Sequence, residues 1–235
     1  MSNSYLDLLA YFGIGGAHPG GFNLTLSLLE DENIQPVDSV LDIGCGTGQT
    51  AAFLAERFHC QVTAVDNHPI MVEKARERFK NRKVSVNAME GDTQHLDFAD
   101  NSFDLIIAES VIVFTDISKT LKELSRVLKS DGRMIIIEMI AEQYLTEELQ
   151  RKVCSLYGIH EVLTEKQWIL QLQQAGFTQV DMINTPSEFI QSDITDINQS
   201  KNINTDFYDL WEEHNEFILR NRKFIGYRTF SCHLT

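Results

Sequence analysis

Val40-Leu41-Asp42-Ile43-Gly44-Cys45-Gly46-Thr47-Gly48 is the stretch of sequence that decides the fold. An aliphatic run ends at a glycine-rich turn, and residues 49–58 then carry apolar side chains at helical spacing. This order of strand, turn and helix is typical of an open α/β sheet, in which ligands bind beyond the carboxyl ends of the strands. The glycines allow backbone N–H groups to approach a ligand, and the helix presents its positive N-terminus there.

The chain on either side of this turn alternates short aliphatic runs with longer amphipathic stretches, which predicts βαβ units and a parallel sheet. Before it, we expect a helix over 4–12, a glycine-rich loop over 13–21 and a second helix to about residue 30. Strands are predicted over 39–43, 61–66, 84–90, 103–109, 133–139, 178–183 and 227–234. Further helices are predicted over 49–58, 69–79, 117–128, 141–157, 165–175 and 207–219, and a polar, turn-rich connection over 184–205.

Composition limits the partners of the chain. Its 235 residues carry 34 acidic and 20 basic side chains, a net charge of −14, which argues against nucleic acid and anionic membranes as partners. No apolar run approaches the roughly 18–20 residues of a membrane span, and the first residues do not resemble a signal peptide, so we expect a cytoplasmic protein. The four cysteines are scattered, which predicts free thiols and no metal site.

Glycine spacing and Asp42 distinguish two classes of nucleotide ligand. A dinucleotide fingerprint has the spacing G-x-G-x-x-G, whereas residues 44–48 have the spacing G-x-G-x-G. The carboxylate of Asp42 would repel a pyrophosphate but would hold an ammonium group. These features favour S-adenosylmethionine (SAM) over a dinucleotide.

Two further strand ends add candidate ligands for a nucleoside. Asp66, followed by Asn67, ends the second strand, and a carboxylate there can accept hydrogen bonds from both ribose hydroxyls. Asp92, followed by Thr93, comes after the third strand, where it could accept from an adenine amine or simply cap a turn. Met71 could pack on the adenine ring or belong to the core.

Together these motifs resemble the class I SAM-dependent methyltransferases, most closely the small-molecule group that includes ubiquinone and menaquinone biosynthesis enzymes. The resemblance also rests on residues 103–107 and 124–133, and it is strong over residues 37–138. It implies that Asp42 and residues 44–48 hold the methionine part of SAM, Asp66 the ribose, and Asp92 with Thr93 the adenine. Glu109 would lie beside the methyl donor. No Asn-Pro-Pro-Tyr-like tetrapeptide follows residue 109, which argues against methylation of nucleobase amines.

The same resemblance implies the fold. We expect a Rossmann-like, doubly wound α/β sheet of seven mostly parallel strands, whose antiparallel last strand lies between the fifth and sixth. An N-terminal helical lid and a helical insertion after the fifth strand would complete it. The chain is predicted to be one domain, 1–235, with a helical cap (1–36), a SAM-binding core (37–139) and a substrate-side insertion with the second half of the sheet (140–235).

Methyl transfer from a sulfonium needs mainly orientation of the reactants, so no catalytic dyad is required. If the acceptor is a hydroxyl or an activated carbon, a base would help, and His18 and Glu109 are the predicted catalytic residues. Other candidates are Glu138, Tyr11 and Tyr144. The loop 18–21 and the insertion after residue 139 are the predicted walls of the acceptor pocket.

The predicted function is therefore methyl transfer from SAM to a small-molecule acceptor, without a metal. Two alternatives remain at this point: a SAM-binding protein without transfer activity, and a NAD-linked oxidoreductase. The sequence predicts neither the acceptor nor the oligomeric state.

Overall fold

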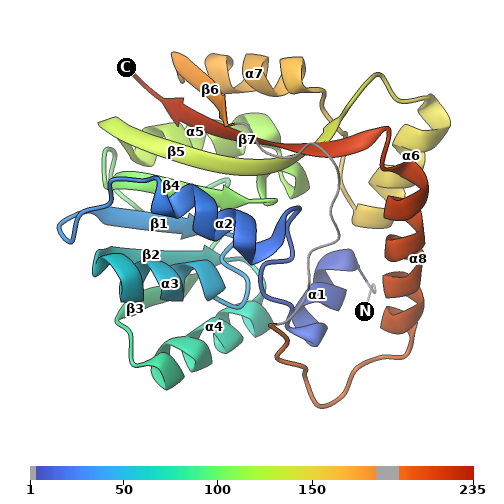
Figure 1. Ribbon diagram of the computed structural model, residues 1–235, viewed down its shortest axis with the longest axis horizontal. Coiled ribbons are helices and arrows are strands. Elements are labelled where there is room, and N and C mark those ends of the chain that lie inside the picture. The colour runs from blue at the N-terminus through green and yellow to red at the C-terminus, as the bar shows by residue number, and fades with distance from the viewer. Residues whose placement is uncertain (1–3, 184–195) are drawn as a thin grey trace.

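A computed structural model describes residues 4–183 and 196–235 and shows a seven-stranded sheet in the order β3-β2-β1-β4-β5-β7-β6. Strands β1 to β5 are parallel, while β7 runs antiparallel to both β5 and β6 (Figure 1). The predicted fold, with an antiparallel last strand inserted beside the fifth, is confirmed. The strands are β1 (Ser39–Ile43), β2 (Gln61–Asp66), β3 (Val86–Glu90), β4 (Phe103–Glu109), β5 (Leu128–Ala141), β6 (Gln179–Ile183) and β7 (Ile225–His233).

Helices cover both faces of the sheet, and three of them, α1, α6 and α8, lie beyond the carboxyl ends of the parallel strands (Figure 1). These three come from distant parts of the sequence and pack at the same end of the molecule, which makes that end a natural position for a site. The helices are α1 (Tyr5–Phe12), α2 (Gly21–Glu30), α3 (Gln49–Phe58), α4 (Pro69–Arg82), the short 3-10 helix η1 (Ile112–Phe114), α5 (Ile117–Val127), α6 (Glu147–Tyr157), α7 (Glu165–Gln174) and α8 (Asp206–Asn221).

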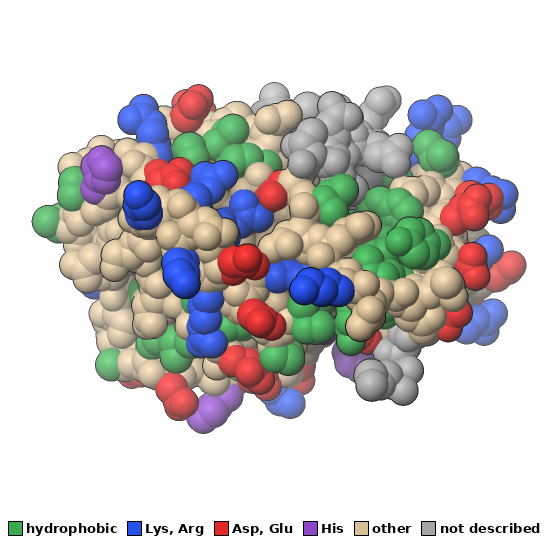
Figure 2. Space-filling view, turned by 90° about the horizontal axis from the view of Figure 1, so that it is seen from below, with side chains coloured by type: hydrophobic (Ala, Val, Ile, Leu, Met, Phe, Trp, Pro, Cys, Tyr) green, Lys and Arg blue, Asp and Glu red, His purple; other side chains and the backbone are tan. Residues whose placement is uncertain are grey.

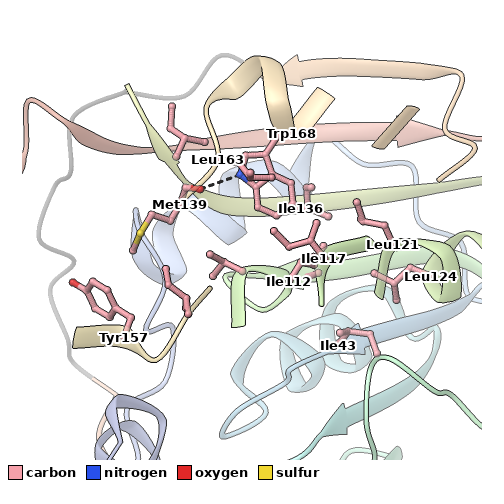
Figure 3. Close-up of a cluster of buried hydrophobic side chains, with 14 of the residues drawn as sticks. Ile43, Ile112, Ile117, Leu121, Leu124, Ile136, Met139, Tyr157, Leu163 and Trp168 are labelled. Carbon is pink, nitrogen blue, oxygen red and sulfur yellow. Dashed lines mark hydrogen bonds between the residues drawn. The ribbon is translucent and has the colours of Figure 1, made fainter. Parts of the chain in front are cut away.

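The central strands are apolar on both faces, as a sheet covered by helices on both sides requires. In β4, Leu105 and Ile107 belong to the hydrophobic cluster beneath α2, α3 and α4, while Ile106 and Ala108 belong to the cluster on the opposite face. Trp168 of α7 is fully buried in the second cluster, where its indole nitrogen donates to the carbonyl of Met139 at 3.1 Å (Figure 3). These two cores fix the sheet and therefore the positions of its strand ends.

Two predicted boundaries differ most from the structure. Strand β5 runs from Leu128 to Ala141 and not over 133–139 as predicted, so residues 130–132 belong to the strand. Helix α6 begins at Glu147 and not at residue 141, because β5 takes the first of these residues and Thr146 caps the helix by accepting from the amide of Leu149. Of the predicted connection over 184–205, residues 184–195 lie outside the described part.

The loop after α1 is fastened to a segment that lies about 185 residues further along the chain, residues 196–200. The amide of Gly15 donates to the carbonyl of Asp196 at 3.0 Å. Arg78 of α4 binds the carboxylate of Asp196 at 2.6 Å and the carbonyl of Thr47, in the glycine turn, at 2.7 Å. The loop after α1 and residues 196–200 are thereby both anchored to the turn that decides the fold.

Candidate active site

A cavity of about 330 Å³ lies at the carboxyl ends of β1, β2 and β4. The glycine turn lines one end of it and aromatic side chains from α1, α6 and α8 line the other. The cavity is thus continuous from the predicted SAM site to a chamber under the N-terminal and C-terminal helices, and it is large enough to hold a small ligand.

The glycine turn has a backbone that favours glycine. Gly44, Gly46 and Gly48 have φ values of +63°, +53° and +76°, in the left-handed region. A Cβ on Gly46 would meet nothing within 4 Å, and this residue lines the cavity, so the missing side chain leaves room for a ligand. Gly48 instead allows α3 to pack on Phe79, and it does not line the cavity.

Two buried oxygen atoms beside the turn lack a hydrogen-bond partner among the described residues: Oδ2 of Asp42 and Oε1 of Gln49. Burial, reinforced by the carboxylates of Glu109 and Asp66, raises the pKa of Asp42 well above its usual range. Buried acceptors without partners are costly. A ligand that brings an ammonium group and a sulfonium would satisfy both the free acceptors and the accumulated negative charge.

Asp66 is held by the backbone around it. Its two carboxylate oxygens accept from the amides of Gly46 and His68, each at 2.8 Å. Burial raises the pKa of Asp66, although these amides act in the opposite direction. Each oxygen keeps a second lone pair, so the carboxylate can still accept from two ribose hydroxyls.

The remaining predicted adenosine contacts are divided between the cavity and the surface. Asn67, Met71 and Thr93 line the cavity, and Cys45 of the turn lines it as well. Asp92 does not. It is exposed and accepts from the amide of Gln94 at 2.9 Å, the turn cap considered as its alternative role. Its contact with adenine stays a prediction.

The two predicted catalytic residues, His18 and Glu109, lie together. His18 is 4% exposed, and its Nε2 is 3.5 Å from Oε1 of Glu109. Thr25 of α2 bridges them, with its hydroxyl 3.1 Å from Nε2 and donating to Oε1 at 2.5 Å. Thr50 of α3 donates to the other carboxylate oxygen, Oε2, at 2.7 Å. Both oxygens of Glu109 are therefore already bound.

Both ring nitrogens of His18 have partners within the protein. Its Nδ1 is 3.1 Å from the carbonyl of Pro19, and its Nε2 is 3.1 Å from the hydroxyl of Thr25. The imidazole is therefore held in place from both sides, next to Glu109.

Comparison with known proteins agrees with this geometry. A family model described as a methyltransferase domain matches residues 41–136. YodH of Bacillus subtilis (strain 168), an uncharacterized methyltransferase, is 33% identical over 227 residues, which cover 96% of this chain and 97% of that protein. The chain belongs to the class I SAM-dependent methyltransferases. Membership of this family favours a methyltransferase with SAM as its cofactor over the two alternatives, a SAM-binding protein without transfer activity and a NAD-linked oxidoreductase.

Other relatives of the methyltransferase match less of their own length. Phosphoethanolamine N-methyltransferase 1 of Arabidopsis thaliana is 28% identical over 81% of this chain, which spans 39% of that enzyme. The demethylmenaquinone methyltransferase of Thermotoga maritima is 35% identical over 51% of each chain. A structure of Haemonchus contortus phosphoethanolamine N-methyltransferase 2 in complex with SAM has a TM-score of 0.75 at 22% identity, over 96% of this chain and 56% of that one, which shows the shared fold.

Three other predicted bases of the methyltransferase do not line the cavity. Tyr144 is 87% exposed and lies outside the cavity, so it is not placed to act as a base on an acceptor there. Tyr11 packs its ring against Phe207, with centroids 5.4 Å apart. Glu138 is fully buried, and its carboxylate accepts from the backbone amides of Val111 and Ile112 at 3.1 and 2.8 Å. Its role is structural, because it holds the start of η1 against β5.

Glu138 should make the methyltransferase less stable as pH rises. Burial raises the pKa of Glu138 to about 8, from 4.5 when exposed. Between these values the unfolded chain has lost a proton that the folded protein retains, so the free energy of unfolding falls as pH rises from about 4.5 to 8. At 1.36 kcal/mol for each pKa unit, the loss is on the order of 4 kcal/mol.

Urea unfolding of the parent and of Glu138→Gln at pH 5 and pH 8 measures this contribution. The amide cannot ionise, so the variant should show a smaller decrease in the free energy of unfolding between the two values. Equal decreases in both proteins would contradict this role of Glu138.

Sequence analysis missed several residues that line the cavity of the methyltransferase. Thr50 lies in the first turn of α3, directly after the glycine turn. This position in the sequence could have indicated that Thr50 lines the site. Trp211, His214 and Ile218 follow one face of α8 at helical spacing, and they line the cavity together with Arg222, which caps this helix. From sequence, this stripe looks like an ordinary core-facing surface.

Within residues 4–183 and 196–235, neither a membrane-spanning helix nor a metal-binding cluster is found. No helix there is long and apolar enough to cross a bilayer. No group of three or more His, Cys, Asp or Glu side chains in the same part is arranged to hold a metal ion.

Proposed function

We propose that this methyltransferase transfers the methyl group of SAM to a small-molecule acceptor by in-line displacement within the cavity. The observation that carries the proposal is that one continuous cavity has unsatisfied buried acceptors, the oxygens of Asp42 and Gln49, at one end and an apolar chamber at the other. When bound, SAM supplies an electrophilic methyl carbon on a sulfonium. The protein's part is to bind, orient and exclude water.

At the acidic end, we assign Asp42 and Gln49 to the ammonium group, because their free oxygens are buried beside the glycine turn. Asp66 would accept from the ribose hydroxyls, and Asn67, Met71 and Thr93 line the space beyond it. These assignments agree with the pattern that the sequence predicts. They place the sulfonium near Glu109, whose negative charge would stabilise it.

His18 and Glu109 serve in this proposal as positioning residues. Their bonds to Thr25 and Thr50 join the loop before α2 and the start of α3 to the end of β4. This network fixes the wall of the cavity next to the donor. Neither residue is bonded in a way that favours proton removal from an acceptor.

A small acceptor is favoured by the way the cavity is covered. Helices α1 and α8 lie over it (Figure 1), and residues from both line it. On the face shown in Figure 2, acidic and basic side chains are interspersed and form no broad basic surface for a nucleic acid. The net charge of −14 also disfavours binding of a nucleic acid.

The test is to supply the protein with isotopically methyl-labelled SAM and a metabolite extract, and to identify labelled products by mass spectrometry. We expect labelled small molecules together with S-adenosylhomocysteine (SAH). Asp66→Ala, which removes the ribose acceptor, should reduce both by at least about tenfold, the effect of losing a charge-assisted hydrogen bond worth roughly 1.5–3 kcal/mol. Label found only on macromolecules, or none beyond that of the variant, would contradict the proposal.

A further inference from the structure

The end of the cavity away from the glycine turn is built from aromatic rings on three helices that are distant in sequence. We call Tyr5, Tyr157, Trp211 and His214 the aromatic chamber; all four line the cavity. The rings of Tyr5 and Tyr157 meet edge to face with centroids 4.9 Å apart, and Trp211 stacks on His214 at 5.3 Å. His214 also packs on Tyr5 and Tyr157, with centroids 5.1 and 5.7 Å apart, so the four rings form one rigid aromatic wall of the cavity.

One polar pair lies within these apolar walls. The hydroxyl of Tyr157 is 3.0 Å from Nδ1 of His214, and both residues line the cavity. Burial lowers the pKa of His214 to about 4 and raises that of Tyr157, so both groups are uncharged at neutral pH. The pair can therefore accept one hydrogen bond from a neutral ligand and donate one to it.

The charges around the chamber disfavour an anionic acceptor. Among the described residues that line the cavity, Arg222 is the one lysine or arginine, and it is exposed. The carboxylates of Asp42, Asp66 and Glu109 lie in the same cavity and would repel a phosphate. A phosphorylated substrate would therefore lose its hydration shell without gaining a buried cationic partner.

A cationic acceptor is also poorly matched to this end. The carboxylates that line the cavity belong to its opposite end, beside the glycine turn and the end of β4, where the proposed SAM site already accounts for them. Aromatic faces attract cations, but one face of Trp211 is covered by His214, and His214 also packs on Tyr5 at 5.1 Å. An ammonium here would face a neutral histidine and two neutral phenols.

Building on the proposed function, we infer that the acceptor is an uncharged, largely apolar molecule with a flat ring and a hydroxyl group that binds the Tyr157–His214 pair. The ring packs against the aromatic wall of the cavity, and burial of its apolar surface supplies most of the affinity. The polar pair fixes its orientation relative to the donor end. Tyr157 and His214 are then specificity-determining residues.

Calorimetric titration of SAH-saturated protein with 2-naphthol, choline and phosphoethanolamine tests this inference. We expect saturable binding of 2-naphthol and none of the two charged compounds at the same concentrations. Tyr157→Phe keeps the ring and removes the hydroxyl, so it should weaken 2-naphthol binding about tenfold, the effect of losing one hydrogen bond of about 1.4 kcal/mol. Tyr144→Phe, the same change at an exposed tyrosine outside the cavity, should leave it unchanged.

His214→Phe provides a second variant, and thermal unfolding of each protein establishes that it is folded. Binding of choline or phosphoethanolamine in place of 2-naphthol would overturn the inference, as would equal affinities of 2-naphthol for the parent and Tyr157→Phe. SAH binding is measured separately on each protein. If SAH itself fails to bind the parent, the proposed function fails; if SAH binds but 2-naphthol does not, only the assignment of the acceptor fails.

Discussion

Gly46→Val should weaken SAH binding by about 5- to 140-fold, because overpacking a fitted site costs roughly 1–3 kcal/mol and each 1.4 kcal/mol is tenfold. A Cβ on Gly46 would enter open space that belongs to the cavity, and the two γ-methyl groups of valine would extend further into it. Calorimetric titration with SAH measures the effect. The same substitution also forces a branched residue into the left-handed region at φ +53°, at a cost of roughly 1–2 kcal/mol in stability.

Gly158→Val separates these two effects. Gly158 ends α6 at φ +71°, and a Cβ there would also meet nothing within 4 Å, but the residue does not line the cavity. The two variants should lose similar amounts of stability, while Gly158→Val binds SAH as the parent does. Equal SAH affinities for Gly46→Val and the parent would remove the glycine turn from the cofactor site.

Trp168→Ala should lower the free energy of unfolding by roughly 3–5 kcal/mol, the range for truncating a buried tryptophan. Trp168 is fully buried between α7 and β5, and its indole is a donor to the carbonyl of Met139 (Figure 3). The alanine leaves a cavity and removes this donor. A loss of this size corresponds to a decrease in melting temperature of about 10 °C for a chain of this length, which calorimetry measures.

Two further variants show why Trp168→Ala loses stability. Trp168→Phe retains most of the buried surface and loses the indole nitrogen, so it should cost less than the alanine. Trp211→Ala changes the other tryptophan, which is half-buried at the cavity, and should cost less stability than Trp168→Ala. A smaller loss at Trp168 than at Trp211 would contradict the assignment of Trp168 to the core.

The sheet order could be predicted because the strongest local sequence patterns are also the motifs that carry the resemblance to the methyltransferase family. The turn after Ile43 and the acidic residue at the end of β2 fall where expected, and β7 pairs with β5 and β6 as the family topology requires. The boundaries of helices and strands were predicted less well where one element extends into residues that were assigned to the next. Strand β5 extends to Ala141 because nine of its residues pair with β7, a long-range contact that local periodicity does not reveal.

The cofactor end of the candidate site was more visible from sequence than the acceptor end. Asp42 and Asp66 stand directly at strand ends, where the chain order itself indicates a site. His214 and Tyr157 come together only through the packing of α6 and α8, 57 residues apart. Thr25 was also missed, because its contact with Glu109 joins elements separated by 84 residues. Such convergences depend on the tertiary structure.

The position of β7 has a consequence for how the protein is made. Strand β5 leaves the ribosome long before residues 225–233, so its outer edge has no partner until those residues have been synthesised. Helix α1 is made before the strands, yet it packs against α8, which follows β6 in the chain. Both contacts therefore wait for segments that are made late, and during synthesis a growing chain exposes both an open strand edge and an unattached apolar helix. A chaperone that shields these surfaces would act during that interval.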